Sequence, residues 1–426
     1  MEKIKLPVEV KTIIDTFYKN NFEIFIVGGC VRDSILHKEP KDWDLCTNAL
    51  VGDIERIANA NNWKVIPTGI KHGTVSVILD KTIYEITTYR IDSNYSDNRH
   101  PDSVEFTDVL EKDLARRDFT INAIAYNDDV GFVDPFGGID DIKKGIIRCV
   151  RDPNERFNED ALRMLRAVRF ALTLKSGKKS FTIEENTRKA IFDNIELVKN
   201  LSAERVNNEL VKSLSFIGND RQVRENLNIL FDLIKTYFEG NINFRWGIGR
   251  VSDVKKTENF NLRLMLFLWE PLDNLQLENR LKYLKFDNNT IRNLNQIQTL
   301  ILRFLLDKIV MPNRTDIKEC MRLFNKQNIL AMLQFFSAEP NNIEWATEFK
   351  NAMSEITENK ECIFMSDLAV DGSDIIKEFD VSGEIIGKIL NKLLYYVYID
   401  DSRNNYNNLI EYAKRLKEIG ERHTGD

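Results

Sequence analysis

The stretch that decides the fold is residues 23–47, which read EIFIVGGCVRDSILHKEPKDWDLCT. It opens with an apolar run that is typical of a strand, and this run ends in Gly28 and Gly29 before a predicted helix over 32–37. Glycines let backbone N–H groups approach a phosphate closely, and Arg32 adds a forked donor. The pattern therefore indicates a phosphate-binding turn, although a Gly-Gly pair is just as typical of an ordinary tight turn.

An acidic pair follows in the segment KDWDLCT. If this segment is a short strand, its period of two aims the carboxylates of Asp42 and Asp44 to one side and Trp43 to the other. Mg²⁺ binds through one or two carboxylates plus substrate phosphates, and a metal pair can neutralise a leaving pyrophosphate. Glu85, on a predicted strand, is either a third carboxylate of the site or an exposed strand residue. An isolated Asp-x-Asp is most often a solvated acidic turn, so the neighbouring glycines are what favour a site.

The rest of the first 150 residues has a mixed pattern. Runs rich in β-branched residues predict strands at 74–79 and 82–89, joined by Asp80 and Lys81 in a tight hairpin, and the segment 53–61 has a helical pattern. Beyond about residue 155 apolar residues recur every three or four positions. The sequence therefore predicts an α/β head followed by a string of amphipathic helices.

Composition limits the possible classes. The 426 residues suit two to four domains, and a 43% apolar content is typical of a globular protein. Because the net charge is -6, a nucleic-acid partner must be met by a local basic patch. The five cysteines are scattered without a Cys-x-x-Cys pair, which argues against disulfides and zinc and favours the reducing cytoplasm. No stretch is long and apolar enough to predict secretion or membrane insertion.

Two later segments concentrate charge. In RRDFTINA, residues 116–123, two adjacent arginines are not expected to share one face, so one of them is interpreted as structural. The segment RFNEDALRMLRAVRF, residues 156–170, is predicted to be one helix with Asp160, Arg163 and Arg166 on adjoining turns. A solvated, salt-bridged helix face is the alternative interpretation of this stripe.

Taken together, these segments resemble the class II tRNA nucleotidyltransferases, which are the bacterial-type CCA-adding enzymes and their poly(A) polymerase relatives. GGCVRD with DWD resembles the family's catalytic motif, RRDFTINA its ribose-binding motif, and RFNEDALRMLRAVRF its nucleotide-reading motif. SAER at 202–205 with Glu209 and Leu210 resembles the motif of the neck helix, and LAVDG at 368–372 a signature of the tail.

The resemblance implies a fold and a domain order. The expected fold is an α/β nucleotidyltransferase head with a polymerase-β-like palm, followed by an all-α neck, body and tail in a hook- or seahorse-shaped molecule. The expected bounds are 1–145 for the head, 146–212 for a neck that recognises the base, 213–320 for the body, and 321–426 for a tail that binds tRNA.

The resemblance also implies roles for individual residues. Asp42 and Asp44 would hold Mg²⁺ and carry the catalysis, with Glu85 assisting. The remaining family positions would bind the nucleotide: Gly28, Gly29 and Arg32 its phosphates, Arg117, Asp118 and Asn122 its ribose, Asp160 and Arg163 its base, and Arg166 and Arg169 its triphosphate. The chemistry of the base readers fits, because a carboxylate accepts from the amino group that C and A share, and a guanidinium donates to the adjacent ring acceptor.

The implied activity is template-independent addition of C, C and A to the 3′ end of tRNA from CTP and ATP, with release of pyrophosphate. The partners would be the 3′ end and the acceptor and T arms of tRNA, and the protein would be a cytoplasmic monomer or dimer. The alternatives are a poly(A) polymerase, an enzyme that adds only CC or only A, and a catalytically inactive tRNA-binding protein. The intact Asp42 and Asp44 argue against the last of these.

One polar segment is expected to resize the base pocket between C and A. Residues 92–102 read DSNYSDNRHPD, which is the composition of a mobile loop, and Arg99 is its predicted lever. A passive connector is the alternative.

Overall fold

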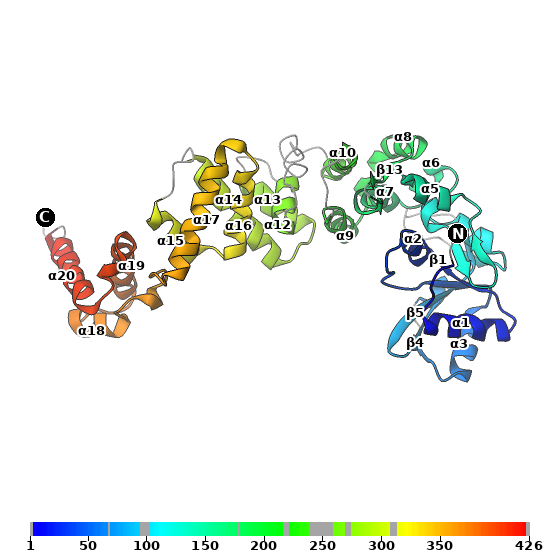
Figure 1. Ribbon diagram of the computed structural model, residues 1–426, viewed down its shortest axis with the longest axis horizontal. Helices are drawn as coiled ribbons and strands as arrows, with labels where there is room; N and C mark the ends of the chain where they lie inside the picture. The colour runs from blue at the N-terminus through cyan, green and yellow to red at the C-terminus, as the bar shows by residue number, and fades with distance from the viewer. Residues whose placement is uncertain are drawn as a thin grey trace. The chain divides into compact units, whose positions relative to one another are not determined.

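The computed structural model describes residues 3–66, 69–93, 103–177, 179–215, 221–238, 259–268, 274–306 and 313–422. The chain forms two compact units (Figure 1). Unit 1 comprises residues 1–252 with 283–285, and unit 2 comprises 253–282 with 286–426. The finer division into head, neck, body and tail stays a prediction. The proposed lever Arg99 lies outside the described residues, as does the rest of 94–102.

Unit 1 is built on a seven-stranded mixed sheet with the order β3-β4-β5-β2-β1-β8-β9. Every neighbouring pair is antiparallel except the parallel pair of β2 and β5. The strands are β1 Ile24–Val27, β2 Leu45–Thr47, β3 Lys64–Ile66, β4 Thr74–Leu79, β5 Thr82–Thr88, β8 Ala125–Asn127 and β9 Gly131–Val133. The parallel pair places Leu45, the first residue of β2, beside Ile86 in the second half of β5, which decides the position of the acidic residues.

The predicted hairpin between β4 and β5 is confirmed. Its two central residues, Asp80 and Lys81, have φ values of 45° and 68°. Positive φ at both positions is the geometry of a type I′ turn, whose twist matches that of the flanking strands. The ends of the loop 92–102 are also paired, because β6 (Arg90–Ser93) and β7 (Ser103–Phe106) form an antiparallel ladder.

The helices of the first 150 residues are α1 Val8–Lys19, α2 Gly29–Ile35, α3 Val51–Ala60, α4 Leu110–Ala115 and α5 Gly138–Lys144. The predicted helix at 32–37 thus begins earlier, at Gly29. The strand interpretation of DWD is wrong by a few residues, because β2 begins only at Leu45. The pairing with β1 nevertheless reaches the acidic segment, since the N–H of Val27 donates to the carbonyl of Asp44 at 3.0 Å.

The predicted single helix over 156–170 is wrong. The structure has α6 (Pro153–Glu159) and α7 (Leu162–Thr173), separated at Asp160. Asp160 has an extended backbone, with φ -146° and ψ 103°, and its carboxylate accepts from the N–H of Leu162 at 3.0 Å. A residue that caps the next helix in this way ends the previous one.

The apolar period of this region is confirmed where it defines the core. Leu165, Val168 and Leu172 of α7 are buried. Helices α8 (Glu185–Asp193), α9 (Ala203–Ser213) and α10 (Arg221–Tyr237) complete the described helical part of unit 1, and α9 and α10 pack against α7. The charged side chains of α7 therefore lie against other helices instead of being fully solvated.

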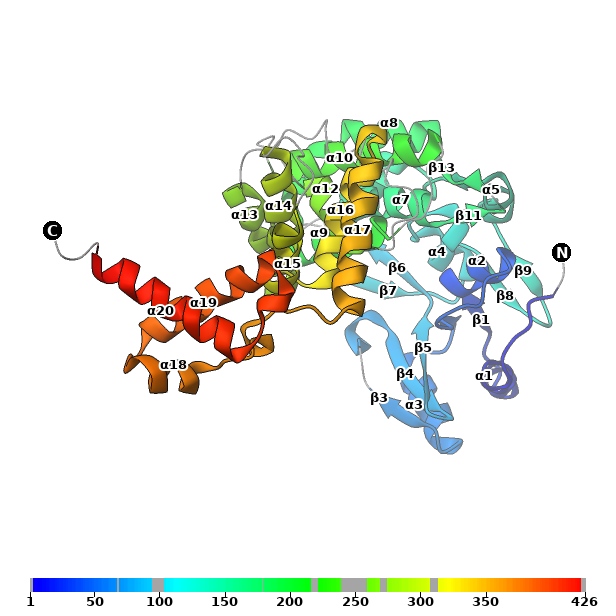
Figure 2. The same cartoon turned by 60° about the vertical axis from the view of Figure 1, so that its left-hand side comes forward.

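Unit 2 is helical throughout its described residues. Its helices are α12 Phe260–Leu268, α13 Asn274–Tyr283 except for its last residue, α14 Asn288–Leu306, α15 Arg314–Leu323, α16 Lys326–Ser337, α17 Ile343–Glu358, α18 Gly372–Phe379, α19 Glu384–Ile399 and α20 Tyr406–Arg422. Figure 2 shows α14, α16 and α17 side by side. The predicted apolar stripe of α14 is buried, whereas Ile385 in the first turn of α19 is 51% exposed.

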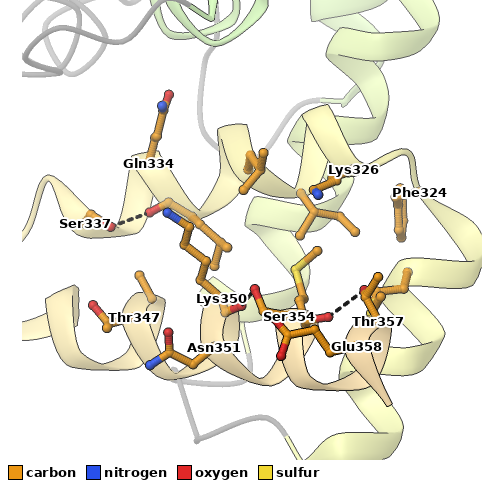
Figure 3. Close-up of a pocket in the computed structure, with 16 residues that line it drawn as sticks. Phe324, Lys326, Gln334, Ser337, Thr347, Lys350, Asn351, Ser354, Thr357 and Glu358 are labelled. Atoms are coloured by element: carbon orange, nitrogen blue, oxygen red, sulfur yellow. Dashed lines mark hydrogen bonds between the residues drawn. The ribbon is translucent and has the colours of Figure 1, made fainter. Parts of the chain in front are cut away.

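A cavity of about 790 Å³ lies between α16 and α17 (Figure 3). Lys350 extends across it from α17 toward α16, and Glu358 is its one acidic lining residue. The hydroxyls of Ser354 and Thr357 donate to carbonyls one turn earlier in their own helix. The lining thus has neither a carboxylate pair nor an arginine, and the chemistry expected from the sequence lies in unit 1.

No helix among the described residues has the length and apolar character needed to cross a bilayer. All five cysteines are buried and free.

A buried lysine joins the helices of unit 2. Lys318 on α15 is 1% exposed, and its Nζ lies 2.9 Å from Glu361 and 3.2 Å from Asp401. Arg314 also donates to Glu361. These hydrogen bonds and charges, that of Arg314 foremost, lower the pKa of Glu361 to about 2. Because this pKa is below its ordinary value, the ion pair stabilises the fold above about pH 4.5, and the stabilisation is lost as the pH falls toward 2.

Replacing Glu361 with Gln should remove this pH dependence. The free energy of opening around α15 and α19 should fall as the pH drops from about 5 to about 2. We expect this fall to be larger in the unaltered protein than in the variant, by up to about 3 kcal/mol. Hydrogen exchange of amides in the two helices measures this. Equal acid sensitivity in both proteins would show that the pair contributes no such linkage.

Candidate functional site

A glycine turn joins the central strand β1 to α2. Gly28 has φ 80° and ψ -124°, and its N–H donates to the carbonyl of Ile124 on the neighbouring segment at 3.2 Å. A Cβ at this position would lie 3.2 Å from Nη1 of Arg117. Glycine is therefore required twice, for the left-handed backbone and for the close approach of the guanidinium.

The carboxylates of Asp44 and Glu85 line a cavity of about 160 Å³, which we call the acidic pocket, together with Arg117. The parallel register pairs Leu45 with Ile86, so the residue before each of them lies at the same level. Burial, and then the charges of Asp42 and Glu85, raise the pKa of Asp44 to about 6, while Arg117 opposes the shift. The carboxylates gather despite their mutual repulsion.

This donor set fits a hard cation. Within the described ranges, the side chains of Asp42, Asp44 and Glu85 have no hydrogen bond or ion pair, so their oxygens are free to coordinate. Those same ranges hold no group of three or more His, Cys, Asp or Glu side chains close enough to form a metal cage. An ion here would need oxygens from a substrate, which is the way Mg²⁺ is usually bound.

Both arginines of RRDFTINA bind one buried carboxylate. Asp113 on α4 is fully buried and accepts from Arg116 at 2.7 Å and from Arg117 at 3.0 Å. The expectation that adjacent arginines cannot share a face is wrong, because α4 ends at Ala115 and the two arginines that follow it donate to different oxygens of Asp113. Burial alone would raise the pKa of Asp113, but Arg117 and Arg116 hold it below its usual value.

The expected ribose and phosphate residues form one network. Arg166 donates twice to Oδ2 of Asp118, at 2.9 and 2.6 Å, and Asn122 donates to the other oxygen at 3.0 Å. Asn122 in turn accepts from Nη1 of Arg32 at 2.7 Å. Burial opposes ionisation of Asp118, yet Arg166 and Asn122 lower its pKa to about 2. Asp118 is therefore an anionic anchor for the cations around it.

Three guanidinium groups surround the ring of Phe170, which is 4% exposed. Their Cζ atoms lie 5.0 Å from the ring centroid for Arg32, 5.4 Å for Arg166 and 4.0 Å for Arg169. We call these three residues the arginine cluster. An aromatic face stabilises nearby cations, and several guanidiniums around one ring make a site suited to a polyphosphate.

Asp160 and Arg163 are both held in place, but by other residues. Arg205 on α9 donates to Asp160 at 2.8 Å, and Arg163 donates to Glu159 at 2.7 Å. The two predicted base readers therefore do not form an ion pair with each other. The solvated-stripe alternative is also wrong for them, because both are largely enclosed.

Two family models match the chain: "Poly A polymerase head domain" at residues 24–148, and "Probable RNA and SrmB- binding site of polymerase A" at 180–216. A CCA-adding enzyme of Ligilactobacillus salivarius is 33% identical over 407 residues, covering 95% of this chain and 96% of the relative. One from Leuconostoc mesenteroides is 31% identical over 423 residues, covering 97% and 98%.

The chain belongs to the family of CCA-adding enzymes. Among solved structures, the Bacillus stearothermophilus CCA-adding enzyme in complex with CTP matches with a TM-score of 0.74 and 25% identity, covering 97% of this chain and 98% of that one. The Thermotoga maritima CCA-adding enzyme complexed with tRNA matches in fold, with a TM-score of 0.71 and 21% identity over 97% and 98% of the two chains.

The sequence did not predict the partners that hold the expected nucleotide-binding residues. Neither pattern nor resemblance indicates a role for Asp113, Glu159 or Phe170. Arg205 and Glu209 belong to the motif that resembles the neck helix, which predicts no contact for them, yet they bind Asp160 and Arg169. The available signal was their spacing of four residues on one helix, which places both on the same face of α9.

Neutralising Glu209 should destabilise the α7–α9 contact. Its carboxylate lies 2.5 Å from Nε of Arg169, and both side chains are largely buried. Glu209→Gln leaves a buried guanidinium without its counter-ion, so we expect a loss of about 2 kcal/mol in the free energy of opening of α7 and α9. Hydrogen exchange of their amides checks this.

The matched control is Glu196→Gln, which removes an exposed partner of Lys199 in the same unit. We expect it to change the same free energy by less than about 1 kcal/mol. Equal effects of the two variants would show that the buried pair of Arg169 and Glu209 stabilises the fold no more than an exposed ion pair does.

Proposed function

We propose that this chain adds C, C and A to the 3′ end of tRNA without a template, using CTP and ATP and releasing pyrophosphate. The observation that carries the proposal is the acidic pocket, where Asp44 and Glu85 lie beside Arg117 and the Gly28 turn without acidic or basic partners of their own. Its support is the full-length similarity to CCA-adding enzymes and to solved structures whose titles name CTP, ATP and tRNA.

We assign Mg²⁺ to Asp42 and Asp44, with Glu85 as an assisting carboxylate. When bound, this ion would neutralise charge on the reacting phosphates and polarise the attacking oxygen. The 3′ oxygen of the tRNA attacks the α-phosphorus of the incoming nucleotide, the bond from that phosphorus to the bridging oxygen breaks, and pyrophosphate leaves. Arg117 and the arginine cluster supply positive charge for the triphosphate on the protein side.

Hydrogen bonds among the proposed nucleotide-binding residues hold their side chains in position. Arg32 and Asn122 are hydrogen-bonded to each other, and Asp118 fixes Arg166, so the phosphate and ribose contacts arise from one network. Asp160 accepts from the amino group of C or A, and Arg163 donates to the neighbouring ring nitrogen. Guanine and uracil present the opposite pattern to both side chains and are rejected. Arg205 and Glu159 set the orientation of these two readers.

The alternatives differ in product. A poly(A) polymerase or an enzyme restricted to CC or A would use the same acidic pocket, so the sequence added to the 3′ end separates them. A catalytically inactive tRNA-binding protein would not need free carboxylates in a pocket beside Arg117. The cytoplasm, where tRNA and reduced cysteines are found together, is the proposed location.

Asp42→Asn and Asp44→Asn should each reduce nucleotide incorporation by at least about 10³-fold, because the charge that holds the metal is lost. Binding of tRNA should stay within about twofold, since neither side chain has a hydrogen bond or ion pair with another described residue. Single-turnover incorporation of labelled CTP and a filter-binding assay measure the two effects. The control is Asp128→Asn, which neutralises an acidic residue elsewhere in the same unit. Near-normal incorporation by either pocket variant would remove these residues from catalysis.

Asp160→Ala and Arg163→Ala should relax base choice more than they weaken binding. A site that pairs with a base edge discriminates because a wrong base leaves its partners unpaired or opposed. We expect misincorporation of UTP and GTP relative to CTP to rise by about 10-fold or more. Competition assays with mixed nucleotides measure this ratio. Unchanged rejection of UTP and GTP would mean that the base is read elsewhere.

A further inference from the structure

A second cavity of the head lies away from the acidic pocket. It has a volume of about 990 Å³ and is bordered by the N-terminal segment 3–7, the end of α2 with the loop that follows, β9 and α5. Trp43 lines this cavity, whereas the next residue, Asp44, lines the acidic pocket. The segment that carries the catalytic carboxylates thus has a different cavity on its other side.

The lining of this cavity, which we call the basic groove, is strongly cationic. Lys3 and Lys5 are exposed, because the alternation along an extended segment buries Ile4 and Leu6 instead. Lys38 and Lys143 come from two other segments, and Glu39 is the one acidic lining residue.

These lysines are not engaged by the protein itself. Lys3, Lys5 and Lys38 have no carboxylate partner within the described part of the chain, and Lys143 has only a loose one, Asp140 at 3.9 Å. In a chain with a net charge of -6, four lysines from three segments at one groove, three of them without a carboxylate partner among the described residues, are a local positive field. The groove therefore suits an anionic ligand.

Aromatic side chains lie among the lysines. Trp43 and Phe132 both line the groove and are only partly buried, although each has a large apolar surface. Solvated lysines on an ordinary surface do not need such neighbours. A groove lined by both lysines and accessible rings suits single-stranded nucleic acids, because phosphates meet the cations and bases stack on the rings.

We propose that the basic groove binds a short single-stranded RNA segment, with bases against Trp43 and Phe132 and phosphates against the lysines. Lysines spread over three segments can follow a backbone, whereas a single nucleotide is usually held by donors that converge on one phosphate. This goes beyond nucleotide addition, because none of the groove residues lines the acidic pocket or belongs to the arginine cluster.

The test is binding of a fluorescently labelled oligouridylate to the full chain, without nucleotide triphosphates or added metal. Lys3→Gln/Lys5→Gln should weaken binding about 10-fold and reduce the slope of log affinity against log salt by about 1.4, as expected for two lost phosphate contacts on a single strand. The control is Lys19→Gln/Lys64→Gln, which removes the same charge from exposed sites outside the groove and should change the affinity by less than about twofold.

A second double variant, Lys38→Gln/Lys143→Gln, should weaken binding to a similar degree. Because the two variants change different segments, a folding defect in one of them does not affect the result from the other. Ultraviolet cross-linking of an oligouridylate that contains 4-thiouridine should map to peptides with residues 3–7 or Trp43. Equal loss in the groove and control variants, or cross-links confined to other segments, would overturn the proposal. Competition by free UMP as strong as that by the oligomer would overturn it in favour of a mononucleotide site. Because no nucleotide is added in these assays, their outcome is independent of CCA addition.

Discussion

Arg117 packs over the glycine turn at Gly28, and this packing is the constraint on which the rest of the site depends. A Cβ at Gly28 would meet the guanidinium at 3.2 Å, and the φ of 80° already disfavours any other residue. The contact joins the central strand, which ends at the turn, to the segment that carries the ribose motif. Through Asp113 the same arginine is fixed to α4. Sheet, glycine turn and cationic wall therefore form as one structure.

Charge pairing divides the carboxylates of unit 1 into two groups. Asp113, Asp118, Asp160, Glu159 and Glu209 each accept from at least one arginine. Within the described residues, the side chains of Asp42, Asp44 and Glu85 have no such partner. Unpaired carboxylates that lie close together repel one another when ionised, and a cation with bound phosphates would relieve this repulsion. The paired ones instead hold arginines ready for an anionic substrate.

The sequence predicted the features that depend on interactions between residues close together in the chain. The strand before Gly28, the hairpin at Asp80 and the helical remainder follow from local pattern. Asp44, Glu85 and Arg117, which the motif resemblance named as site residues, line one cavity. The sequence could not predict that Asp160 ends one helix and is held by Arg205, because that hydrogen bond joins residues 45 positions apart. The shared use of Asp113 by two adjacent arginines was likewise missed, since it depends on how deeply α4 is buried.

In the proposed function, one acidic pocket with one pair of base readers builds a defined trinucleotide. The most direct measurement is to incubate the chain with Mg²⁺ and a tRNA transcript that lacks its terminal CCA, supply CTP, ATP or both, and sequence the 3′ ends. We expect CC with CTP alone, CCA with both, and little addition with ATP alone. Runs of A with ATP alone, or no addition under any condition, would contradict it.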